Sequence, residues 1–331
     1  MDRFALLSLG EVWKSHSTGK FPVTCRTGKH ANSARNVMLT VRVKGPFDLE
    51  LSLAGAASFL PLDQAPAILA TAVELDGIPT AITISQPAGR TTIVKASAMP
   101  PIGKTALERI VKWLVWAELD LSSFYRLASG DAVLGPVIAD LHGLKPLRPA
   151  SLFEMAIIAI TEQQLSLAAA FRIRMRLVER FGFQQEALRR FPSAETLAAA
   201  SIQDLQRCGL SRRKAEYVKE LAQRVAGGIL DFDALLHQND ARIRDALLTL
   251  RGFGEWSVEY ILARGFGRAD ALPSGDVGLQ RVLGHYFARG RRLTAAELER
   301  MLAPFRPFRS IAAYYLAVHW RLRPTGAGLQ A

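Results

Sequence analysis

A chain of 331 residues is long enough for two or three domains that each bury a core. Hydrophobic residues make up 49% of it, and no apolar run approaches the ~18 residues of a membrane span, which indicates a globular protein. Two cysteines, Cys25 and Cys208, exclude a disulfide framework, a four-thiolate zinc site and an iron–sulfur cluster. The formal net charge of +12 favours a polyanionic partner, most often nucleic acid.

The basic charge is concentrated at the N-terminus. Residues 1–45 hold eight Lys and Arg against two acidic residues, which gives this segment half of the net charge of +12. The segment is polar and has no clear hydrophobic period, so we expect a flexible extension. A basic arm that steers DNA is the functional alternative.

Residues 46–120 are expected to form a small α+β domain with an antiparallel sheet. Gly and Pro separate short β-rich or alternating runs. A helix or helical turn is expected between the strands, and a longer helix with a clear apolar side follows them. The strands are expected at residues 47–55, 78–85 and 91–97, and the two helices at 62–75 and 105–119.

Strand signals end near residue 120, and residues 121–323 are expected to form an all-α domain followed by a short tail, 324–331. Several of the helices begin at plausible N-caps, such as Ser193 and Thr294. The helices are expected at residues 151–160, 166–182, 193–201, 212–226, 241–250, 256–266, 277–287, 294–302 and 308–322. The predicted fold class is therefore α+β.

The stretch LRGFGEW, residues 250–256, predicts a tight turn between two helices. A helix interior loses about 1 kcal/mol per Gly relative to Ala, so Gly252 and Gly254 indicate a break, and Phe253 between them can plug into the core. Backbone N–H groups at the start of the second helix are then free to face a phosphate. An ordinary glycine-rich helix connection remains the alternative for this stretch alone.

Beyond this turn, Asp276 stands where the next helix is expected to begin, after the connector Pro273–Ser274–Gly275. In isolation such an Asp is usually an N-cap, a preference worth about 1 kcal/mol. The hairpin, one helix, a Pro/Gly connector and then an Asp together resemble the helix-hairpin-helix DNA glycosylase superfamily. Its DNA-3-methyladenine glycosylase II branch is also similar at residues 152–170, 207–222 and 306–322, and weakly at 44–59.

The resemblance implies that Asp276 is the catalytic carboxylate and that Arg251, Gly252, Phe253 and Gly254 grip the DNA backbone. Bifunctional relatives carry a Lys nucleophile where this chain has Trp256, so the resemblance implies base removal without strand cleavage. Trp256 and Tyr260 share a helical face and are expected to wall the base pocket. Core packing is the alternative for both.

Other site residues are implied by the same resemblance. Gln164 aligns with the position that enters the DNA beside the flipped nucleotide, and Gln163 lies next to it; a polar helix connection is the alternative. No cofactor is expected, although a Na⁺ or K⁺ ion can sit on the Gly252 and Gly254 backbone. The last expected helix carries four aromatic side chains, those of Tyr314, Tyr315, His319 and Trp320. We assign them to the core and leave open that one of them lines the base pocket.

The resemblance thus implies a monomeric DNA N-glycosylase of base excision repair, acting on double-stranded DNA that contains alkylated purines, in a bacterial cytoplasm with the nucleoid and not at a membrane. A non-catalytic helix-hairpin-helix DNA-binding protein, or a glycosylase for deaminated or oxidised purines, are the alternatives. The basic group Arg212, Arg213 and Lys214 is expected either to contact phosphate or to be solvated, and His285 is expected to pack.

Overall fold

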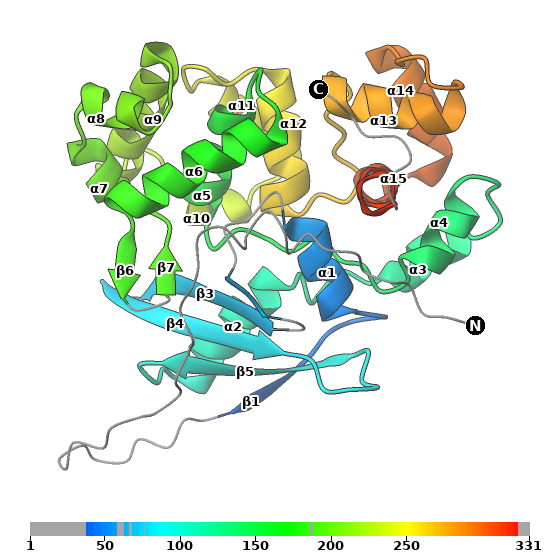
Figure 1. Ribbon diagram of the computed structural model, residues 1–331, viewed down its shortest axis with the longest axis horizontal. Coiled ribbons are helices and arrows are strands. Elements are labelled where there is room, and N and C mark those ends of the chain that lie inside the picture. Colours follow the sequence, from blue (N-terminus) through cyan, green and yellow to red (C-terminus); the bar gives the residue numbers. More distant parts are fainter. Residues whose placement is uncertain (1–37, 58–62, 66–67, 76, 186–187, 324–331) are drawn as a thin grey trace, which may run out of the picture. The chain divides into compact units, whose positions relative to one another are not determined.

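The computed structural model describes residues 38–57, 63–65, 68–75, 77–185 and 188–323. In these ranges an antiparallel sheet comes first and helices follow, so the expected α+β class is confirmed (Figure 1). The sheet has the strand order β1-β5-β4-β3-β2. Its strands are β1 (Leu39–Arg42), β2 (Asp63–Ala65), β3 (Ile68–Leu75), β4 (Ile78–Ser85) and β5 (Ile93–Met99).

Period-two burial in the central strands fixes one face of the sheet to the core. Ile82 and Ile84 of β4, and Val94 and Ala96 of β5, are all fully buried, and more exposed residues separate them. Helix α1 (Leu49–Ala56) contacts β3, and helix α2 (Lys104–Leu114) contacts β1 and β5. The expected strand at 78–85 is confirmed as β4, and the strand expected at 91–97 is present as β5. The helix expected at 105–119 is present as α2 but ends at Leu114.

Two of the expected elements in this domain are wrong. Residues 47–55 form helix α1 instead of a strand, because the Asp48 side chain accepts a hydrogen bond from the Leu51 amide and caps the helix. Where a helix was expected at 62–75, the described residues form β2 and β3, because β3 pairs with β4 along its whole length across a turn at Gly77, whose φ is +76°.

The sheet also begins earlier than expected. Strand β1 lies inside the segment 1–45 that was predicted to be an extension, and it pairs with β5 from Leu39 to Arg42. Val41 and Val43 are buried in the core at this edge. The prediction of an extension is thus wrong for residues 39–45, and residues 1–37 lie outside the described part of the chain.

Helices make up most of the chain after α2. They are α3 (Leu121–Ala128), α4 (Leu134–Asp140), α5 (Leu152–Glu162), α6 (Leu167–Phe181), α7 (Ala194–Ala199), α8 (Ile202–Arg207), α9 (Arg212–Ala226), α10 (Phe232–Leu236), α11 (Asp240–Leu248), α12 (Glu255–Ile261), α13 (Val277–Phe287), α14 (Ala295–Leu302) and α15 (Arg309–Leu322). A π-helical turn, η1 (Leu262–Phe266), extends α12, and a short 3₁₀ turn, η2 (Ala303–Phe305), precedes α15.

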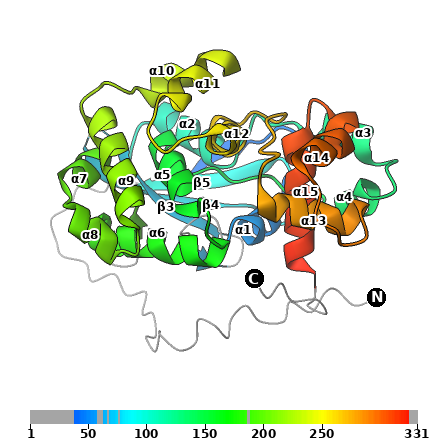
Figure 2. The same cartoon turned by 90° about the horizontal axis from the view of Figure 1, so that it is seen from above.

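Buried side chains divide these helices into two groups. One cluster joins the sheet and α2 with α5 to α12, and the other joins α3 and α4 with α13 to α15. Figure 2 shows α13 to α15 beside α3 and α4, with α12 facing them. The chain therefore crosses between the groups three times, after α2, before α5 and after η1, and the last of these connections leads to Asp276 at the start of α13.

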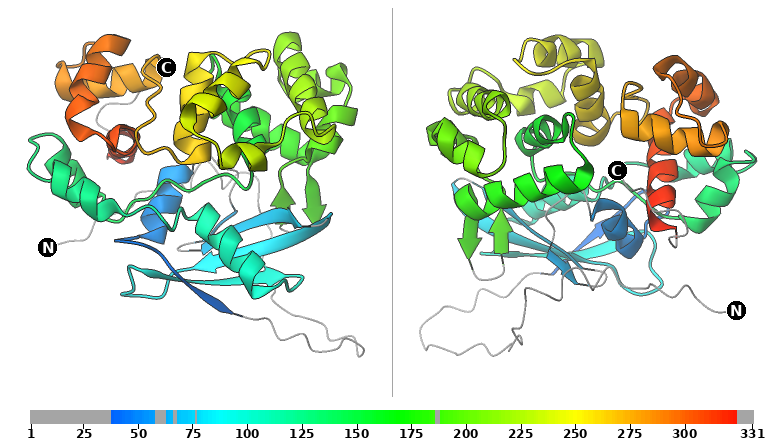
Figure 3. Two further views of the ribbon diagram at one scale, coloured as in Figure 1. Left: turned by 180° about the vertical axis from the view of Figure 1, so that it is seen from behind. Right: turned by 45° about the horizontal axis from the view of Figure 1, so that its top comes forward.

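The all-α expectation for residues 121–323 fails at one place. A two-stranded antiparallel ribbon, β6 (Phe183–Gln185) and β7 (Leu188–Arg190), follows α6. Its second strand contacts β3, and Arg190 forms an ion pair with Glu74 of that strand. Figure 3 shows this ribbon extending from the helices toward the sheet. The ribbon is stabilised by this tertiary contact, which local residue preferences do not reveal.

Candidate active site

The predicted helix-hairpin-helix is present, with α11 and α12 joined by a tight turn. Gly252 has φ of +90°, and a Cβ atom on it would lie 2.3 Å from Cδ2 of Tyr217, so both the backbone and the space require glycine. Phe253 is 8% exposed and fills the core beneath the turn, as predicted. Gly254 has no such requirement, because its backbone is extended and a Cβ atom there would meet nothing within 4 Å.

The start of α12 is open to a ligand. Gly254 is the N-cap and supplies no side chain to the first amides of the helix. Arg251 points back over α9, with its guanidinium 5.5 Å from the Tyr217 ring centre and 3.5 Å from Glu216. The Arg251 side chain is therefore held by groups of the protein, although more than half of it stays exposed.

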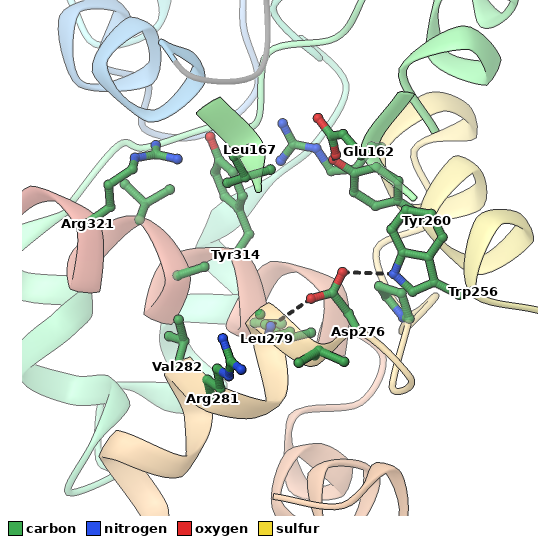
Figure 4. A pocket seen from close by; sticks show the side chains of 18 of the residues that line it. Glu162, Leu167, Trp256, Tyr260, Asp276, Leu279, Arg281, Val282, Tyr314 and Arg321 are labelled. Carbon is green, nitrogen blue, oxygen red and sulfur yellow. Dashed lines mark hydrogen bonds between the residues drawn. The ribbon is translucent and has the colours of Figure 1, made fainter. Parts of the chain in front are cut away.

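Asp276 caps a helix, as one of its two interpretations predicts, and its carboxylate also lies at a cavity. As the N-cap of α13, it accepts a hydrogen bond through Oδ1 from the Leu279 amide at 2.7 Å. Its Oδ2 accepts a hydrogen bond from Nε1 of Trp256 at 2.8 Å. The half-buried carboxylate also lines a cavity (Figure 4). The cap thus holds the carboxylate in place at the cavity edge.

An aromatic wall continues from this carboxylate. The Trp256 and Tyr260 rings are stacked, with centres 5.3 Å apart and planes 22° apart. The Tyr260 hydroxyl donates to Oε2 of Glu162 at 2.8 Å, and Oε1 of Glu162 pairs with Arg174 at 2.9 Å. Burial raises the pKa of Tyr260 well above its ordinary value. Trp256, Tyr260 and Glu162 all line the cavity.

The adjacent residues Gln163 and Gln164 have different surroundings. Nε2 of Gln163 donates to the Gly252 carbonyl at 2.7 Å and to the Ser257 hydroxyl at 3.1 Å, so this amide joins α5 to the hairpin. Gln164 is exposed and has φ of +56°, unusual for a residue other than glycine. Both glutamines line the cavity, and Gln164 is the more exposed of the two.

The basic group at the start of α9 has structural partners. Nζ of Lys214 donates to the carbonyls of Thr161 and Gln163, at 3.0 and 2.6 Å, and so caps the C-terminus of α5. Burial lowers the pKa of Lys214. Arg212 pairs with Glu216 at 3.2 Å. The alternative that this group is solvated is therefore wrong for Lys214.

The cavity has a volume of about 1440 Å³ and lies between the two helical groups. Of the four residues left open at the end of the chain, Tyr314 and Trp320 of α15 line it. Tyr315 instead donates to the Leu144 carbonyl, and His319 bonds Tyr286 and Asp140, so these two belong to the core. His285 lines the cavity with its ring 4.0 Å from that of Trp320.

The described ranges contain neither a candidate metal site nor a candidate membrane-spanning helix. Nowhere in them do three or more His, Cys, Asp or Glu side chains gather in a way that could hold a metal ion. Across the same part of the chain, no helix is long and apolar enough to cross a bilayer. Cys208 is a buried thiol that packs beneath α8, and Cys25 lies outside the described residues.

Comparison with known proteins agrees with this geometry. Residues 157–307 match the family model of the HhH-GPD superfamily of base excision DNA repair proteins. A DNA-3-methyladenine glycosylase of Bacillus subtilis is 30% identical over 229 residues, which are 67% of this chain and 75% of the relative. The chain belongs to the HhH-GPD superfamily, in the branch of the DNA-3-methyladenine glycosylases.

Two further proteins support the assignment. YfjP of Bacillus subtilis, named as a candidate DNA-3-methyladenine glycosylase, is 28% identical over 265 residues, 76% of this chain and 90% of that protein. The solved structure of a 3-methyladenine DNA-glycosylase from Archaeoglobus fulgidus superposes with a TM-score of 0.75 at 23% identity, over 86% of this chain and 98% of that one. At this identity the superposition shows that the fold is shared.

Sequence reasoning missed the buried charges behind the aromatic wall. Glu162 ends the apolar run of α5, and Arg174 lies among the apolar residues of α6, with 6% and 0% of their surfaces exposed. A charge on the buried stripe of a helix is a signal that the sequence offers. One charge of each sign on two consecutive helices indicates a buried pair, and this pattern could have found them.

Proposed function

We propose that this chain is a monofunctional DNA N-glycosylase that removes alkylated purines, of the 3-methyladenine and 7-methylguanine type, and leaves an abasic site. The observation that carries the proposal is the Asp276 carboxylate at the cavity edge, held by the Trp256 indole N–H at 2.8 Å. The relatives named DNA-3-methyladenine glycosylase support the substrate class.

The cavity must first receive a base that has left the DNA stack. Leaving the stack costs a few kcal/mol and costs least for a damaged or poorly paired base. A volume of about 1440 Å³ is ample for a purine. Its wall of Trp256 and Tyr260 offers a flat aromatic face on which a flipped purine can stack.

The bond between C1′ and the base nitrogen then breaks, and its electron pair leaves with the base. In an alkylated purine that carries a positive charge, this pair neutralises the charge, so the leaving base needs no strong acid. Positive charge develops at C1′ and the ring oxygen of the sugar, where the Asp276 carboxylate stabilises it. Water then adds to C1′ and loses its proton to the carboxylate or to solvent.

Trp256 explains why the reaction stops there. An indole has no amine that could attack C1′ and form the Schiff base through which a lysine cuts the strand. Its N–H instead donates to Oδ2 of Asp276. Because each carboxylate oxygen has more than one lone-pair site, the oxygens held by Trp256 and Leu279 can still face the sugar.

DNA is gripped by the hairpin in this proposal. Amides at the start of α12, which Gly254 leaves without a side-chain cap, are suited to a phosphate. The exposed Gln164 enters the stack beside the flipped nucleotide. A monovalent cation on the hairpin carbonyls would share the Gly252 oxygen with Gln163, which already donates to it at 2.7 Å. No step of the reaction depends on this ion.

The substitution Asp276→Asn tests the function. It should abolish release of 3-methyladenine from a duplex that carries one defined lesion, while affinity for DNA is kept or increased, because one negative charge near phosphates is removed. Asp233→Asn, at an exposed position in α10, is the matched control. Near-wild-type release by Asp276→Asn would overturn the assignment.

The alternatives give different results in the same screen. A non-catalytic DNA-binding protein would bind every duplex and release no base, and a glycosylase for deaminated or oxidised purines would release those bases but not the alkylated ones. We also infer that the enzyme acts with the nucleoid in the bacterial cytoplasm, which the bacterial origin of the two Bacillus subtilis relatives supports, and that it acts as a monomer. Sedimentation with and without DNA would measure the oligomeric state.

A further inference from the structure

A second carboxylate lies at the end of the aromatic wall away from Asp276. Glu162 is the last residue of α5, lines the cavity and is 6% exposed. Figure 4 shows Glu162, Tyr260, Trp256 and Asp276 following one another along one side of the cavity. The two stacked rings are therefore bracketed by two carboxylates, and each ring donates its polar hydrogen to one of them.

The Glu162 carboxylate is held in its ionised form by Arg174. This guanidinium is fully buried and lies 2.9 Å from Oε1 of Glu162. Burial raises the pKa of Glu162, while Arg174 and the Tyr260 hydrogen bond oppose that effect. A neutral Glu162 would leave the buried Arg174 charge without this counter-charge, which is strongly unfavourable, so we take the pair to be ionic.

These bonds change the charge distribution of the rings. A hydroxyl or indole N–H that donates to a carboxylate is polarised, and neighbouring hydrogen bonds in a low-dielectric site strengthen this polarisation. Electron density is thereby shifted onto the ring, whose face attracts cations. The stacked pair gains this density at both ends, from the Tyr260 bond and from the Trp256 bond.

Four arginines also line the cavity, Arg264, Arg281, Arg321 and Arg323. Arg264 and Arg321 act electrostatically on Tyr260, and Arg264 also acts on Glu162. The Glu162 carboxylate counters this positive charge at the Tyr260 end of the wall, so a cationic group is repelled less there than beside Arg281 and Arg323. A neutral base experiences much less of this difference.

We propose that Glu162 is a specificity-determining residue, which through Tyr260 makes the aromatic wall select flipped bases that carry a positive charge over neutral bases of similar size. The inference rests on the proposed glycosylase function, because it assigns a role within the same cavity. Glu162 acts on the base through the Tyr260–Trp256 stack and takes no part in bond breaking.

The substitution Tyr260→Phe tests this role most directly. It keeps the ring and the Glu162–Arg174 pair but removes the hydroxyl that donates to Glu162. The kcat/KM for release of 7-methylguanine, a cation while bonded to the sugar, should fall about 3- to 10-fold relative to that for neutral hypoxanthine. Tyr286→Phe, which removes a hydroxyl bonded to His319 outside the cavity lining, should leave the ratio unchanged.

A second variant removes the carboxylate itself. Glu162→Gln is combined with Arg174→Met, because the single change would remove the carboxylate that lies against this buried charge. The double variant should lower the same ratio at least as far as Tyr260→Phe does. Inhibition provides an independent reading: the 7,9-dimethylguanine cation should lose potency against both variants, and neutral 9-methylguanine should not.

The outcomes separate this inference from the function on which it rests. A wild-type enzyme that releases no cationic base contradicts the proposed function. A wild-type enzyme that releases 7-methylguanine, with variants that lose both substrates and both inhibitors equally, contradicts only the role of Glu162. Thermal unfolding of each variant shows whether an equal loss comes from a damaged fold.

Discussion

The Trp256 side chain touches both parts of the proposed chemistry. Its N–H holds one oxygen of Asp276 at 2.8 Å, and its ring stacks on Tyr260 with centres 5.3 Å apart. In the proposed function, the same residue thus orients the carboxylate and forms the face that receives the base. Substitutions that separate these two contributions are therefore informative.

Trp256→Phe keeps an aromatic ring and removes the N–H donor. A hydrogen bond to a charged group contributes about 1.5–3 kcal/mol, so kcat for base release should fall by roughly one to two orders of magnitude while KM changes little. Single-turnover release of 7-methylguanine would measure this. A rise in KM at constant kcat would show instead that stacking is the contribution that matters.

The substitution Trp256→Lys tests whether a lysine at position 256 is enough for strand cleavage. The amine would stand at the position of a strand-cutting nucleophile, but a cavity shaped around an indole that donates to Asp276 does not align it with C1′. We expect no strand cleavage above wild type and no borohydride-trapped covalent complex with DNA. Efficient trapping would show that residue 256 alone decides between the two reaction types.

At the residue scale, sequence identifies what is local and misses what is brought together by folding. Asp276 and Trp256 were found because a connector and a hairpin mark them within one short segment. Glu162 and Tyr260 are 98 positions apart, and the hydrogen bond between them depends on how α5 packs against α12. The same holds for Lys214, whose role as a cap of α5 requires α9 to lie beside it.

At the level of elements, the two hairpin glycines are not equivalent. Gly252→Ala combines a left-handed backbone with a Cβ atom placed 2.3 Å from the Tyr217 ring, whereas Gly254→Ala adds a Cβ atom in open space on an extended backbone. We expect Gly252→Ala to destabilise the protein by more than about 1 kcal/mol and to weaken DNA binding, and Gly254→Ala to unfold like wild type. Urea unfolding and binding to an undamaged duplex would measure both effects, and equal loss in the two variants would contradict this account of the turn.

Glu154, in the first turn of helix α5, makes a pH-dependent contribution to the stability of the protein. Burial raises the pKa of Glu154 to about 7, against the hydrogen bond from the Ala150 amide and the charge of Arg174. Because the folded state then holds a proton that the unfolded chain releases near pH 4.5, stability from this residue is present below that pH and is lost as pH rises toward about 7. The free energy of unfolding of wild type should therefore fall over this range relative to Glu154→Gln. A pH-independent difference between the two proteins would contradict the shift.

Some elements could be assigned from sequence, and others could not. Strand β4 alternates clearly, and α2 and α13 show the helical period. The Leu-rich and Ala-rich segment of β2 and β3 looked helical, because pairing with β4 overrides its local preference. Strands β6 and β7 have only three residues each and depend on contact with β3.

On the scale of the whole molecule, the basic N-terminal segment, residues 1–45, also contributes to the fold through strand β1. Residues 1–35 carry six basic and two acidic side chains. Residues 39–42 are strand β1, and the carbonyl of Lys44 accepts a hydrogen bond from the buried Lys145 at 2.6 Å. Two truncations therefore separate a contribution of charge from a contribution of fold.

Deletion of residues 1–35 should leave the unfolding temperature and the turnover at physiological salt close to wild type, with slower association at low salt, because six basic side chains are lost. Deletion of residues 1–45 should lower the unfolding temperature by several degrees, because β5 loses its partner strand β1. Turnover and thermal unfolding at two salt concentrations would measure this. Collapse of turnover in the shorter deletion would identify the segment as a DNA-binding arm.

The hydrogen bonds from Gln163 to the hairpin bear on how the protein would examine DNA for damaged bases. The Gln163 amide joins the end of α5 to the Gly252 carbonyl and the Ser257 hydroxyl, while Lys214 fixes the other side of the same junction. In the proposed function, these bonds join the hairpin that grips the DNA backbone to Gln164, the residue that enters the stack. They thereby fix the distance between the phosphate that is bound and the nucleotide that is tested.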